Sequence, residues 1–364
     1  MSKQRVIVIG GGLAGLAATM KMAELGMSVL LVSFLPVKRS HSVCAQGGIN
    51  GAVNIKGEGD SPDIHFYDTV KGGDFLAHQP LCKDMCHHAP YIINLMDRLG
   101  VTFNRTPEGN LDFRRFGGTL YHRTAFAGAT TGQQLLYALD EQVRHYEVQG
   151  LVEKMEWHEY LGAVLNDDGR CVGAVIHNLR SGEISTEKGD AVILATGGPG
   201  LVYGRSTNSM VCTGTAVTSA YLQGAKYGIG EFIQIHPSAI PGRDKLRLMS
   251  ESARGEGGRV WVPRKAGDSR KPKEIPEKER FYFLEERYPL FGNLVPRDVG
   301  AREIYDICVN DKLGVHGEMK VYLDLTHHTR EFLDRRLGGI LEIYEKFTGV
   351  DPREEPMEIF PAVH

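Results

Sequence analysis

The fold is decided close to the N-terminus by the run Arg5-Val-Ile-Val-Ile-Gly10-Gly-Gly12-Leu-Ala-Gly15, which continues through good helix formers to another glycine. This order predicts a strand, a glycine turn and a helix, and the apolar run Met27–Val32 predicts a second strand. Gly10 permits the tight turn, Gly12 lets the backbone approach a pyrophosphate, and Gly15 lets the helix pack on the strand. The diphosphate would lie at the positive end of the helix. We therefore expect a dinucleotide-binding α/β domain.

The overall composition limits the kinds of protein that this chain can be. A length of 364 residues exceeds one ordinary domain, so we expect two lobes. Hydrophobic residues make up 42% and the formal net charge is only −3, which describes a soluble globular chain and argues against nucleic-acid binding. No apolar run is long enough to cross a bilayer and no signal cleavage site follows the N-terminus, so we expect a cytoplasmic chain. Six scattered cysteines favour reduced thiols.

One short cluster, Cys82-Lys-Asp-Met-Cys86-His87-His88, has residue types that bind metals. The spacing of four places Cys82 and Cys86 on one face of a helix that continues through Tyr91–Asp97. A buried or surface helix face therefore explains the cluster better than a metal site, and we expect no metal.

The segment Pro36–Gly51 is rich in small and hydrogen-bonding residues and carries His41 in its middle. Val32 is followed by Ser33, so the acidic residue that usually holds the adenosine ribose at the end of the second strand is absent. From the residues alone, this segment is either built to lie along a ligand or is a polar surface loop.

The run Arg39-Ser40-His41-Ser42, followed by Ala45-Gln46-Gly47-Gly48-Ile49, resembles the flavin-attachment segment of succinate dehydrogenase and fumarate reductase flavoprotein subunits. The resemblance covers essentially the whole chain, and two runs, Lys245–Glu251 and Asn293–Asp298, look most like the branch found in Bacillus-type complexes. The other matching blocks are Phe66–Asp74, Arg115–Gly118, Ala195–Gly198, Ile235–Pro237 and Glu251–Gly258.

The resemblance implies FAD bound covalently through His41, a bond that raises the flavin potential enough to take electrons from a saturated carbon pair. Where many relatives carry an acidic FAD contact, this chain has Cys212-Thr213-Gly214-Thr215, so that contact is left open. The cofactor-binding residues implied by the resemblance are Gly10, Gly12, Leu13, Ala14, Gly15, Ser33, Arg39, Ser40, His41, Ser42, Gln46, Gly47, Gly48 and Asp74.

A small dicarboxylate needs cationic and hydroxyl groups at both ends and a group that moves a proton. By resemblance, Arg297 is the proton donor to fumarate or acceptor from succinate. Because the high pKa of a guanidinium normally keeps it protonated, a relay through Glu251 and neighbouring charged groups would ease the proton transfer. Each of these residues also has a purely structural alternative. Arg297 could form a surface ion pair with Asp298 or a nearby acid, His236 could be a core histidine at the end of a strand Glu231–Ile235, and Phe116 could fill the core between domains. The substrate-binding residues implied by the resemblance are His236, Ser250, Glu251, His364 and Phe116.

The expected fold class is α/β: a Rossmann-like FAD-binding domain of the glutathione-reductase-like type with an inserted α+β capping domain. We expect the FAD-binding domain at 1–233, the capping domain at 234–356, and the start of a return to the FAD-binding domain at 357–364. The strand Asp190–Gly198 would return the chain to the dinucleotide sheet after a hairpin region at 170–185. The proline-rich charged run Pro263–Arg280 favours a solvated loop.

The resemblance implies oxidation of succinate to fumarate, with electrons passed to an iron-sulfur subunit and a membrane-anchor cytochrome b subunit at the inner face of the cell membrane. The alternatives are a fumarate reductase, an L-aspartate oxidase without the covalent histidine, and a noncatalytic FAD-binding assembly protein. The resembling proteins continue past His364 with the final strands of the FAD sheet and another substrate-binding arginine. We therefore expect an incomplete FAD site and an exposed sheet edge in the chain as given.

Overall fold

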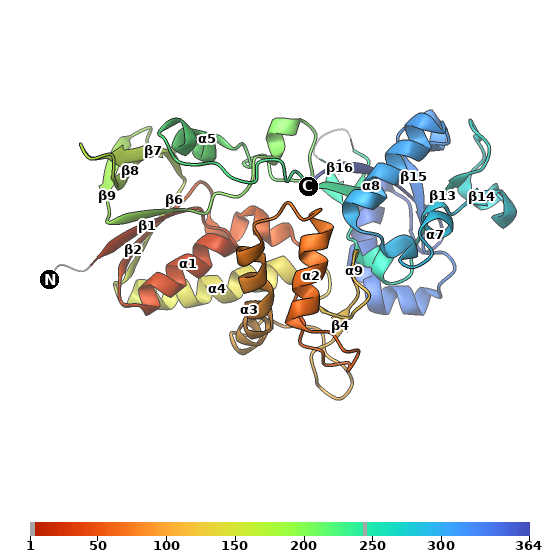
Figure 1. The fold of residues 1–364 in the computed structure, drawn as a ribbon, viewed down its shortest axis with the longest axis horizontal. Coiled ribbons are helices and arrows are strands. Elements are labelled where there is room, and N and C mark those ends of the chain that lie inside the picture. Colours follow the sequence, from red (N-terminus) through yellow and green to blue (C-terminus); the bar gives the residue numbers. More distant parts are fainter. Residues whose placement is uncertain (1–3, 243–245) are drawn as a thin grey trace.

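The computed structural model describes residues 4–242 and 246–364, so Lys245 of the Bacillus-type block lies outside the described residues. Figure 1 shows two lobes side by side, the first built on a parallel sheet with helices beneath it and the second built on a larger antiparallel sheet. The described C-terminal end lies between the lobes (Figure 1). The two lobes expected from the chain length are therefore present.

The first lobe is organised by a four-stranded sheet in the order β10-β1-β2-β6, with all neighbours parallel. The two central strands, β1 and β2, are almost continuous apolar runs, as expected for parallel strands covered on both faces. The helices α1 and α4 cover one face (Figure 1). The predicted strand–turn–helix–strand unit and the returning strand near residue 190 are thus confirmed. The bounds are β1 Arg5–Ile9, α1 Leu13–Glu24, β2 Ser28–Ser33, α4 Thr131–Val148, β6 Val152–Glu156 and β10 Ala191–Leu194.

The other face of the parallel sheet is covered by an antiparallel sheet of β7 (His158–Leu165), β8 (Cys171–Asn178) and β9 (Ile184–Lys188). This is the hairpin region expected at 170–185. The helix α5 (Thr215–Leu222) is fastened to β7 because Ser219 Oγ donates to Leu161 O at 2.6 Å. An apolar cluster joins this sheet to β1 and β2.

A helical hairpin of α2 (Pro62–Gly72) and α3 (Gln79–Arg98) packs beside a small sheet in the order β3-β5-β4. The small strands are β3 Ile49–Asn50, β4 Phe113–Arg114 and β5 Thr124–Ala125. Ser61 caps α2 by accepting from the backbone N–H of Ile64 at 3.2 Å. Cys86 of α3 is buried, with its sulfur 3.6 Å from Thr69 Oγ1 of α2. The cysteine pair therefore belongs to a helix face, as predicted.

The second lobe is built on a six-stranded antiparallel sheet in the order β12-β11-β16-β15-β13-β14. The long helix α9 (Arg330–Thr348) begins at Thr329, whose side chain accepts from Phe332 N, and ends at Gly349 in the left-handed conformation. The other bounds are β11 Ile235–Ile240, β12 Arg247–Leu248, α6 Ser252–Gly255, β13 Arg259–Pro263, β14 Arg280–Phe281, α7 Phe283–Arg287, α8 Arg297–Tyr305, β15 Val321–Asp324 and β16 Met357–Val363.

Two expectations about this lobe need correction. A strand was expected at Glu231–Ile235, but β11 begins at Ile235, so His236 starts a strand and does not end one. The segment 357–364 was expected to begin the return to the first domain, yet residues 357–363 form β16 between β11 and β15 of the second sheet. The end of β16 does touch the first lobe, where Ser206 pairs with Val363. Cross-strand pairing, which local pattern does not encode, decides both points.

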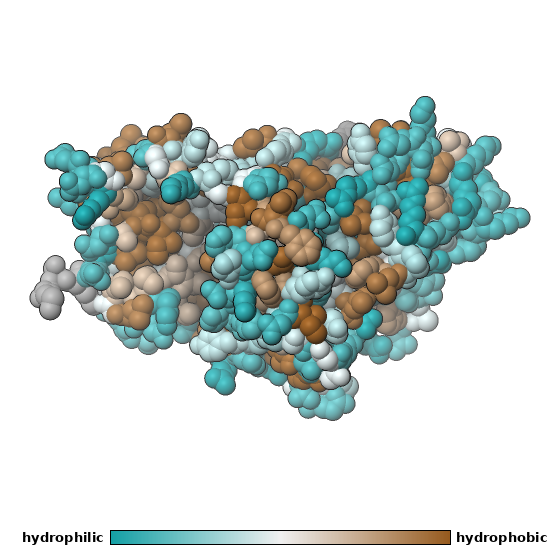
Figure 2. Space-filling model, viewed as in Figure 1, coloured by the Kyte–Doolittle hydropathy of each residue, from teal (hydrophilic) through white to brown (hydrophobic). Residues whose placement is uncertain are grey.

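Short helical turns connect these elements, and the charged run 263–280 is mostly exposed, as predicted. Figure 2 shows that the end of the second lobe carrying β13 and β14 is largely hydrophilic. No helix in the described ranges combines the length and apolar character needed to cross a bilayer. Two turns matter below, η1 (Val37–Arg39) and η2 (His41–Cys44).

Candidate functional site

The glycine turn between β1 and α1 requires glycine at two of its positions. Gly10 has φ +116°, and a Cβ there would lie 2.2 Å from Ala195 O. A Cβ at Gly15 would lie 1.7 Å from Gly10 O, so any side chain would push α1 off β1. Ala14 is exposed at the first turn of the helix, where the backbone N–H groups have no partners within the helix itself. The turn has the form expected of a phosphate cradle.

The segment 40–48 lies over this helix end. Ser42 Oγ accepts from the backbone N–H of Leu13 at 3.1 Å, and a Cβ at Gly12 would lie 3.1 Å from the same oxygen. The segment also packs on the start of α4, where Gly132 N donates to Ala45 O at 2.8 Å. Ser33, at the end of β2, is buried and donates to Leu35 O at 2.5 Å. Residues separated by some thirty positions in the sequence therefore form one surface.

Two polar side-chain atoms of this segment are buried without a hydrogen-bond partner among the described residues: Ser40 Oγ and Gln46 Oε1. Such atoms cost free energy unless a ligand satisfies them. Arg39 is exposed at the end of η1, and Asp74 lies in the exposed turn that follows α2. The structure therefore brings the glycine turn and most of the segment 40–48 together and leaves Asp74 outside this surface.

A second cluster gathers around the buried carboxylate of Glu251, which precedes α6. Arg297, the first residue of α8, donates from Nε to Glu251 Oε2 at 2.8 Å and from Nη1 to Gln234 Oε1 at 2.7 Å. Arg254 donates to the other oxygen, Glu251 Oε1, at 2.5 Å. Arg297 is thus held by a buried carboxylate, and the predicted alternative pairing takes a different form: Asp298 pairs with Arg302 at 2.9 Å.

Arg254 is a site residue to which the sequence reasoning gave no role. It is 2% exposed and donates to Asn293 O at 2.8 Å and Val295 O at 3.4 Å. Burial lowers its pKa, the neighbouring Glu251 raises it and Arg297 lowers it. The sequence spacing could have predicted the contact between Arg254 and Glu251. Arg254 lies three residues after Glu251 and therefore on the same side of one helical turn.

His236 and His364 lie near the first and last residues of the second lobe in the sequence, but their rings face each other. The ring centroids are 5.1 Å apart. The Nδ1 of His236 accepts from the backbone N–H of Ser238 at 3.2 Å, so the proton of the neutral ring resides on Nε2. That Nε2 is buried without a hydrogen-bond partner in the described chain. On His364, Nδ1 lies 2.7 Å from Thr207 Oγ1.

Both imidazoles are neutral at physiological pH. Burial, reinforced by Arg297 and His364, holds the pKa of His236 well below its usual value. Burial and the charges of Arg297 and His41 lower the pKa of His364 to about 4. Two neutral rings can each donate one N–H to a carboxylate without adding charge. Ser238 and Thr207 set the orientation of these rings, and no sequence pattern indicated that role.

Phe116 connects the two clusters. It is buried, its ring lies 5.9 Å from the guanidinium of Arg297, and a Cβ at Gly47 would lie 2.6 Å from its Cζ. A Cβ at Gly117 would lie 2.2 Å from Glu251 Oε1, so the glycine is needed for the close approach of the lobes. Ser250 is buried, with its hydroxyl 2.8 Å from Ser252 Oγ. All five residues predicted to bind the substrate, and Arg297, thus belong to one region.

Comparison with known families agrees with this geometry, because the family model described as FAD binding domain matches residues 5–364. The chain belongs to the FAD binding domain family. It is 67% identical over 364 residues to the succinate dehydrogenase flavoprotein subunit of Bacillus subtilis, covering 100% of this chain and 60% of that protein. It is 37% identical over 369 residues to the corresponding subunit of Rickettsia felis, covering 99% and 58%.

Among solved structures, an E. coli quinol fumarate reductase is similar with a TM-score of 0.84 and 30% identity, covering 100% of this chain and 60% of that one. The chain therefore spans about 60% of the length of the relatives that it matches. The predicted FAD-binding α/β fold is confirmed, and the names of these relatives agree with the predicted resemblance.

The residues present fit FAD. The glycine turn can donate backbone N–H groups to a diphosphate. Beside it, the buried Ser40 Oγ and Gln46 Oε1 could form hydrogen bonds with polar groups of the cofactor. FAD supplies the chemistry that amino-acid side chains lack, the acceptance of a hydride.

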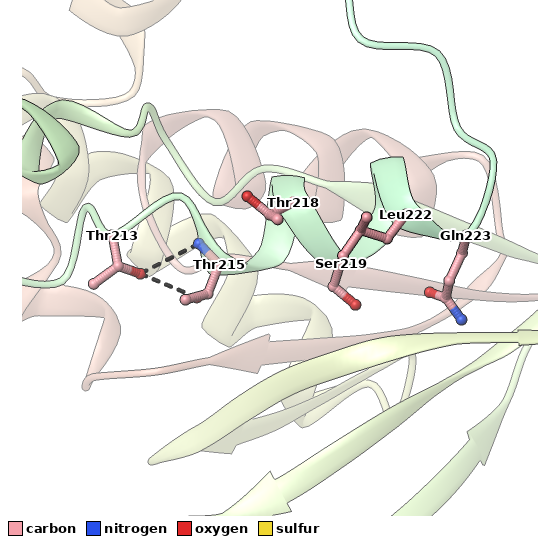
Figure 3. Close-up of a pocket in the computed structure, with 6 residues that line it drawn as sticks. All are labelled: Thr213, Thr215, Thr218, Ser219, Leu222 and Gln223. Carbon is pink, nitrogen blue, oxygen red and sulfur yellow. Dashed lines mark hydrogen bonds between the residues drawn. The ribbon is translucent and has the colours of Figure 1, made fainter.

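A pocket of about 510 Å³ lies along α5 and the turn that precedes it, and Figure 3 shows its lining residues. Thr213 and Thr215 are hydrogen-bonded to each other at 3.0 Å, and the side chain of Gln223 bonds both the N–H and the C=O of Ala163. No acidic side chain lines it, which agrees with the departure noted at residues 212–215. The lining residues are Thr213, Thr215, Thr218, Ser219, Leu222 and Gln223.

Proposed function

We propose that the whole protein is the flavoprotein subunit of a succinate dehydrogenase, which oxidises succinate to fumarate with FAD as the hydride acceptor. The observation that carries the proposal is the position of Arg297. Its guanidinium is held by the buried Glu251 and faces the aromatic ring of Phe116, close enough to His236 and His364 to lower the pKa of both.

The cluster suits a dicarboxylate. The Nε2–H of His236 and the ring of His364 are neutral donors, and Arg297 adds a positive charge when the substrate binds, so a dianion would form charge-assisted hydrogen bonds in a largely buried site. Burial strengthens these contacts because water is excluded.

The same cluster accounts for the proton. Oxidation of succinate removes a hydride from one carbon and a proton from the next. Arg297 can accept that proton only after it gives one of its own to Glu251, whose Oε2 lies 2.8 Å from Nε. Arg254, bonded to the other oxygen of Glu251, stabilises the carboxylate between turnovers. Arg297 and Glu251 together give the proton a route from the substrate to a buried carboxylate.

We also propose that FAD is bound covalently through His41. This residue lies on η2, directly before Ser42 over the end of α1, and its charge lowers the pKa of His364. A flavin attached there would lie between the glycine turn and the Arg297 cluster. The remaining cofactor contacts follow from the positions described above, with Asp74 the weakest member of the set.

We propose the domain type, the domain boundaries and the partner subunits as well. The FAD-binding domain is of the glutathione-reductase-like type and occupies residues 1–233, and the capping domain begins at 234, close to the start of β11 at Ile235. The whole protein passes its electrons to an iron-sulfur subunit and a membrane-anchor cytochrome b subunit at the inner face of the membrane. The similarity to subunits named succinate dehydrogenase supports these partners.

Fumarate reductase is the second candidate, because the E. coli quinol fumarate reductase shares the fold and one site can serve both directions. An L-aspartate oxidase would share the pocket but not the covalent histidine.

The test uses the full-length protein in its assembled complex. After denaturation and digestion, mass and fluorescence should locate the flavin on the peptide that bears His41. His41→Ala should release it, whereas His316→Ala, which changes an exposed histidine of the second lobe, should not. Flavin released intact from the assembled wild type would refute the covalent assignment and favour an L-aspartate oxidase or a fumarate reductase without the covalent bond.

A further inference from the structure

The side chain of Arg114, on β4, forms hydrogen bonds with backbone carbonyls of the segment 46–48. Its Nε donates to Gly47 O at 3.1 Å, its Nη2 donates to Gln46 O at 3.3 Å, and Nη2 also donates to Gly47 O. The Cζ of the guanidinium lies 4.1 Å from the ring centroid of Phe126 and 5.7 Å from that of Phe116. This geometry fixes the position of two successive peptide groups.

The guanidinium of Arg114 is a buried positive charge, and its hydrogen-bond partners are neutral backbone carbonyls. Arg114 is 2% exposed, and no carboxylate in the described ranges forms an ion pair with it. Its Nη1 is buried without a hydrogen-bond partner there. Burial lowers its pKa to about 10, with Glu256 opposing the shift, so the side chain stays protonated at neutral pH. A buried charge without a counter-ion is costly and calls for an explanation.

The peptide geometry gives that explanation. In a trans peptide the C=O and the following N–H point in opposite directions. Because Arg114 draws the carbonyls of Gln46 and Gly47 toward itself, the N–H groups of Gly47 and Gly48 face the other way. Gly48 has φ +128°, and a Cβ there would lie 2.4 Å from Ala125 O, so this arrangement requires glycine. The positive ends of both peptide dipoles, backed by a cation, are thus presented on one side.

We propose that Arg114 is a positioning residue for the flavin, which orients the Gln46–Gly48 backbone and places a buried positive charge behind it to favour the reduced, more negatively charged cofactor. The inference rests on the proposed function, in which these residues line FAD. A reduced flavin gains electrons and a negative charge, and two oriented N–H dipoles with a cation behind them stabilise that charge without reorganisation.

A purely structural role for Arg114 predicts something different. If the guanidinium only pinned β4 to the segment 46–48, its replacement would lower stability and FAD content but would leave the potential of the flavin that remains unchanged. The flavin midpoint potential therefore separates the two roles.

The experiment compares the full-length enzyme in its complex with Arg114→Met and with Arg115→Met, a matched control in which the neighbouring, more exposed arginine is changed. FAD content, flavin absorption and midpoint potential are measured for each. In Arg114→Met the ratio of reduced to oxidised flavin at a fixed potential should fall roughly tenfold, the effect of one unit charge acting over about 10 Å at an effective dielectric constant of about 20. Arg115→Met should match the wild type. An unchanged potential in flavin-loaded Arg114→Met would overturn the inference.

Arg114→Lys keeps the test decisive if Arg114→Met does not fold. A buried ammonium titrates more readily than a guanidinium. The midpoint potential of Arg114→Lys should therefore fall more steeply than that of the wild type between pH 7 and pH 10, and an identical pH dependence would also overturn the inference. Absence of FAD from the wild type would instead refute the proposed function, so the two failures are distinguishable.

Discussion

At the scale of single residues, Glu251 sets the chemistry of the site. It is 2% exposed and is bonded by two arginines, one on each oxygen. Removing one partner of a buried ion pair leaves an uncompensated charge, which typically costs about 3–5 kcal/mol. A substitution of either arginine is therefore informative only if the new side chain keeps the positive charge.

Arg297→Lys keeps the charge but loses the fork that bonds Glu251 and Gln234 together. We expect kcat/KM for succinate to fall by about 10²–10⁴-fold, the usual contribution of a positioned proton-transfer group, with FAD content unchanged. Steady-state kinetics and flavin absorption check this. Arg302→Lys, on an exposed position of the same helix, is the matched control. Nearly normal activity in Arg297→Lys would remove Arg297 from the proton route.

His65 gives a prediction about stability and pH. It is buried in α2, and burial together with Arg123 lowers its pKa to about 4, below the ordinary value of 6.5. Between these two pH values the unfolded state binds more protons, so stability falls as pH drops from about 6.5 toward 4. In His65→Gln this loss should be smaller. Urea unfolding of the full-length protein at pH 7 and pH 5 measures it, and equal pH dependence in both proteins would contradict it.

At the scale of elements, the contact of α1 with β1 depends on one missing side chain. A Cβ at Gly15 would lie 1.7 Å from Gly10 O, which is backbone and cannot move aside. Gly15→Ala should therefore displace the helix end, abolish FAD retention and destabilise the lobe. Gly72→Ala at the end of α2 is the control, because nothing lies within 4 Å of a Cβ there. FAD content after gel filtration, with the melting temperature, decides between the two outcomes. A Gly15→Ala protein that keeps FAD would show that the contact is dispensable.

At the scale of the whole molecule, ionic contacts set how the two lobes meet. Arg336 of α9 donates to both oxygens of Glu256, at 3.0 and 2.8 Å, and to Asp112 of the first lobe at 3.1 Å. The Asp112 bond crosses between the lobes, and the guanidinium of Arg336 lies 5.8 Å from the ring of Phe126, which Arg114 also contacts. It therefore helps to hold the Arg297 cluster against the segment 46–48.

Arg336→Gln should loosen this junction and raise the KM for succinate several-fold, with a smaller change in kcat and with FAD retained. Steady-state kinetics at two ionic strengths test it, since the wild-type KM should rise with salt while that of the variant should change less. Arg330→Gln, which alters a salt bridge at the exposed start of the same helix, is the control. An unchanged KM in Arg336→Gln would mean that apolar contacts alone align the lobes.

The sequence by itself determined the parts that obey local rules. The strand, glycine turn, helix and second strand follow from Gly10, Gly15 and the apolar runs around them, because short-range sterics and burial act at fixed offsets along the chain. The segment around His41 and the identities of Arg297 and Glu251 were accessible through blocks of residues at characteristic spacing.

Only the tertiary structure decided which distant residues meet. His236 and His364 are 128 positions apart, yet their rings face each other because β11 and β16 are neighbouring antiparallel strands. The roles of Arg254, Ser238 and Arg114 likewise depend on backbone carbonyls supplied by other segments of the chain. Sequence spacing fixes neighbours within one helix or strand, whereas strand register and the packing of two lobes fix the rest, since these arise from the summed burial of the whole chain.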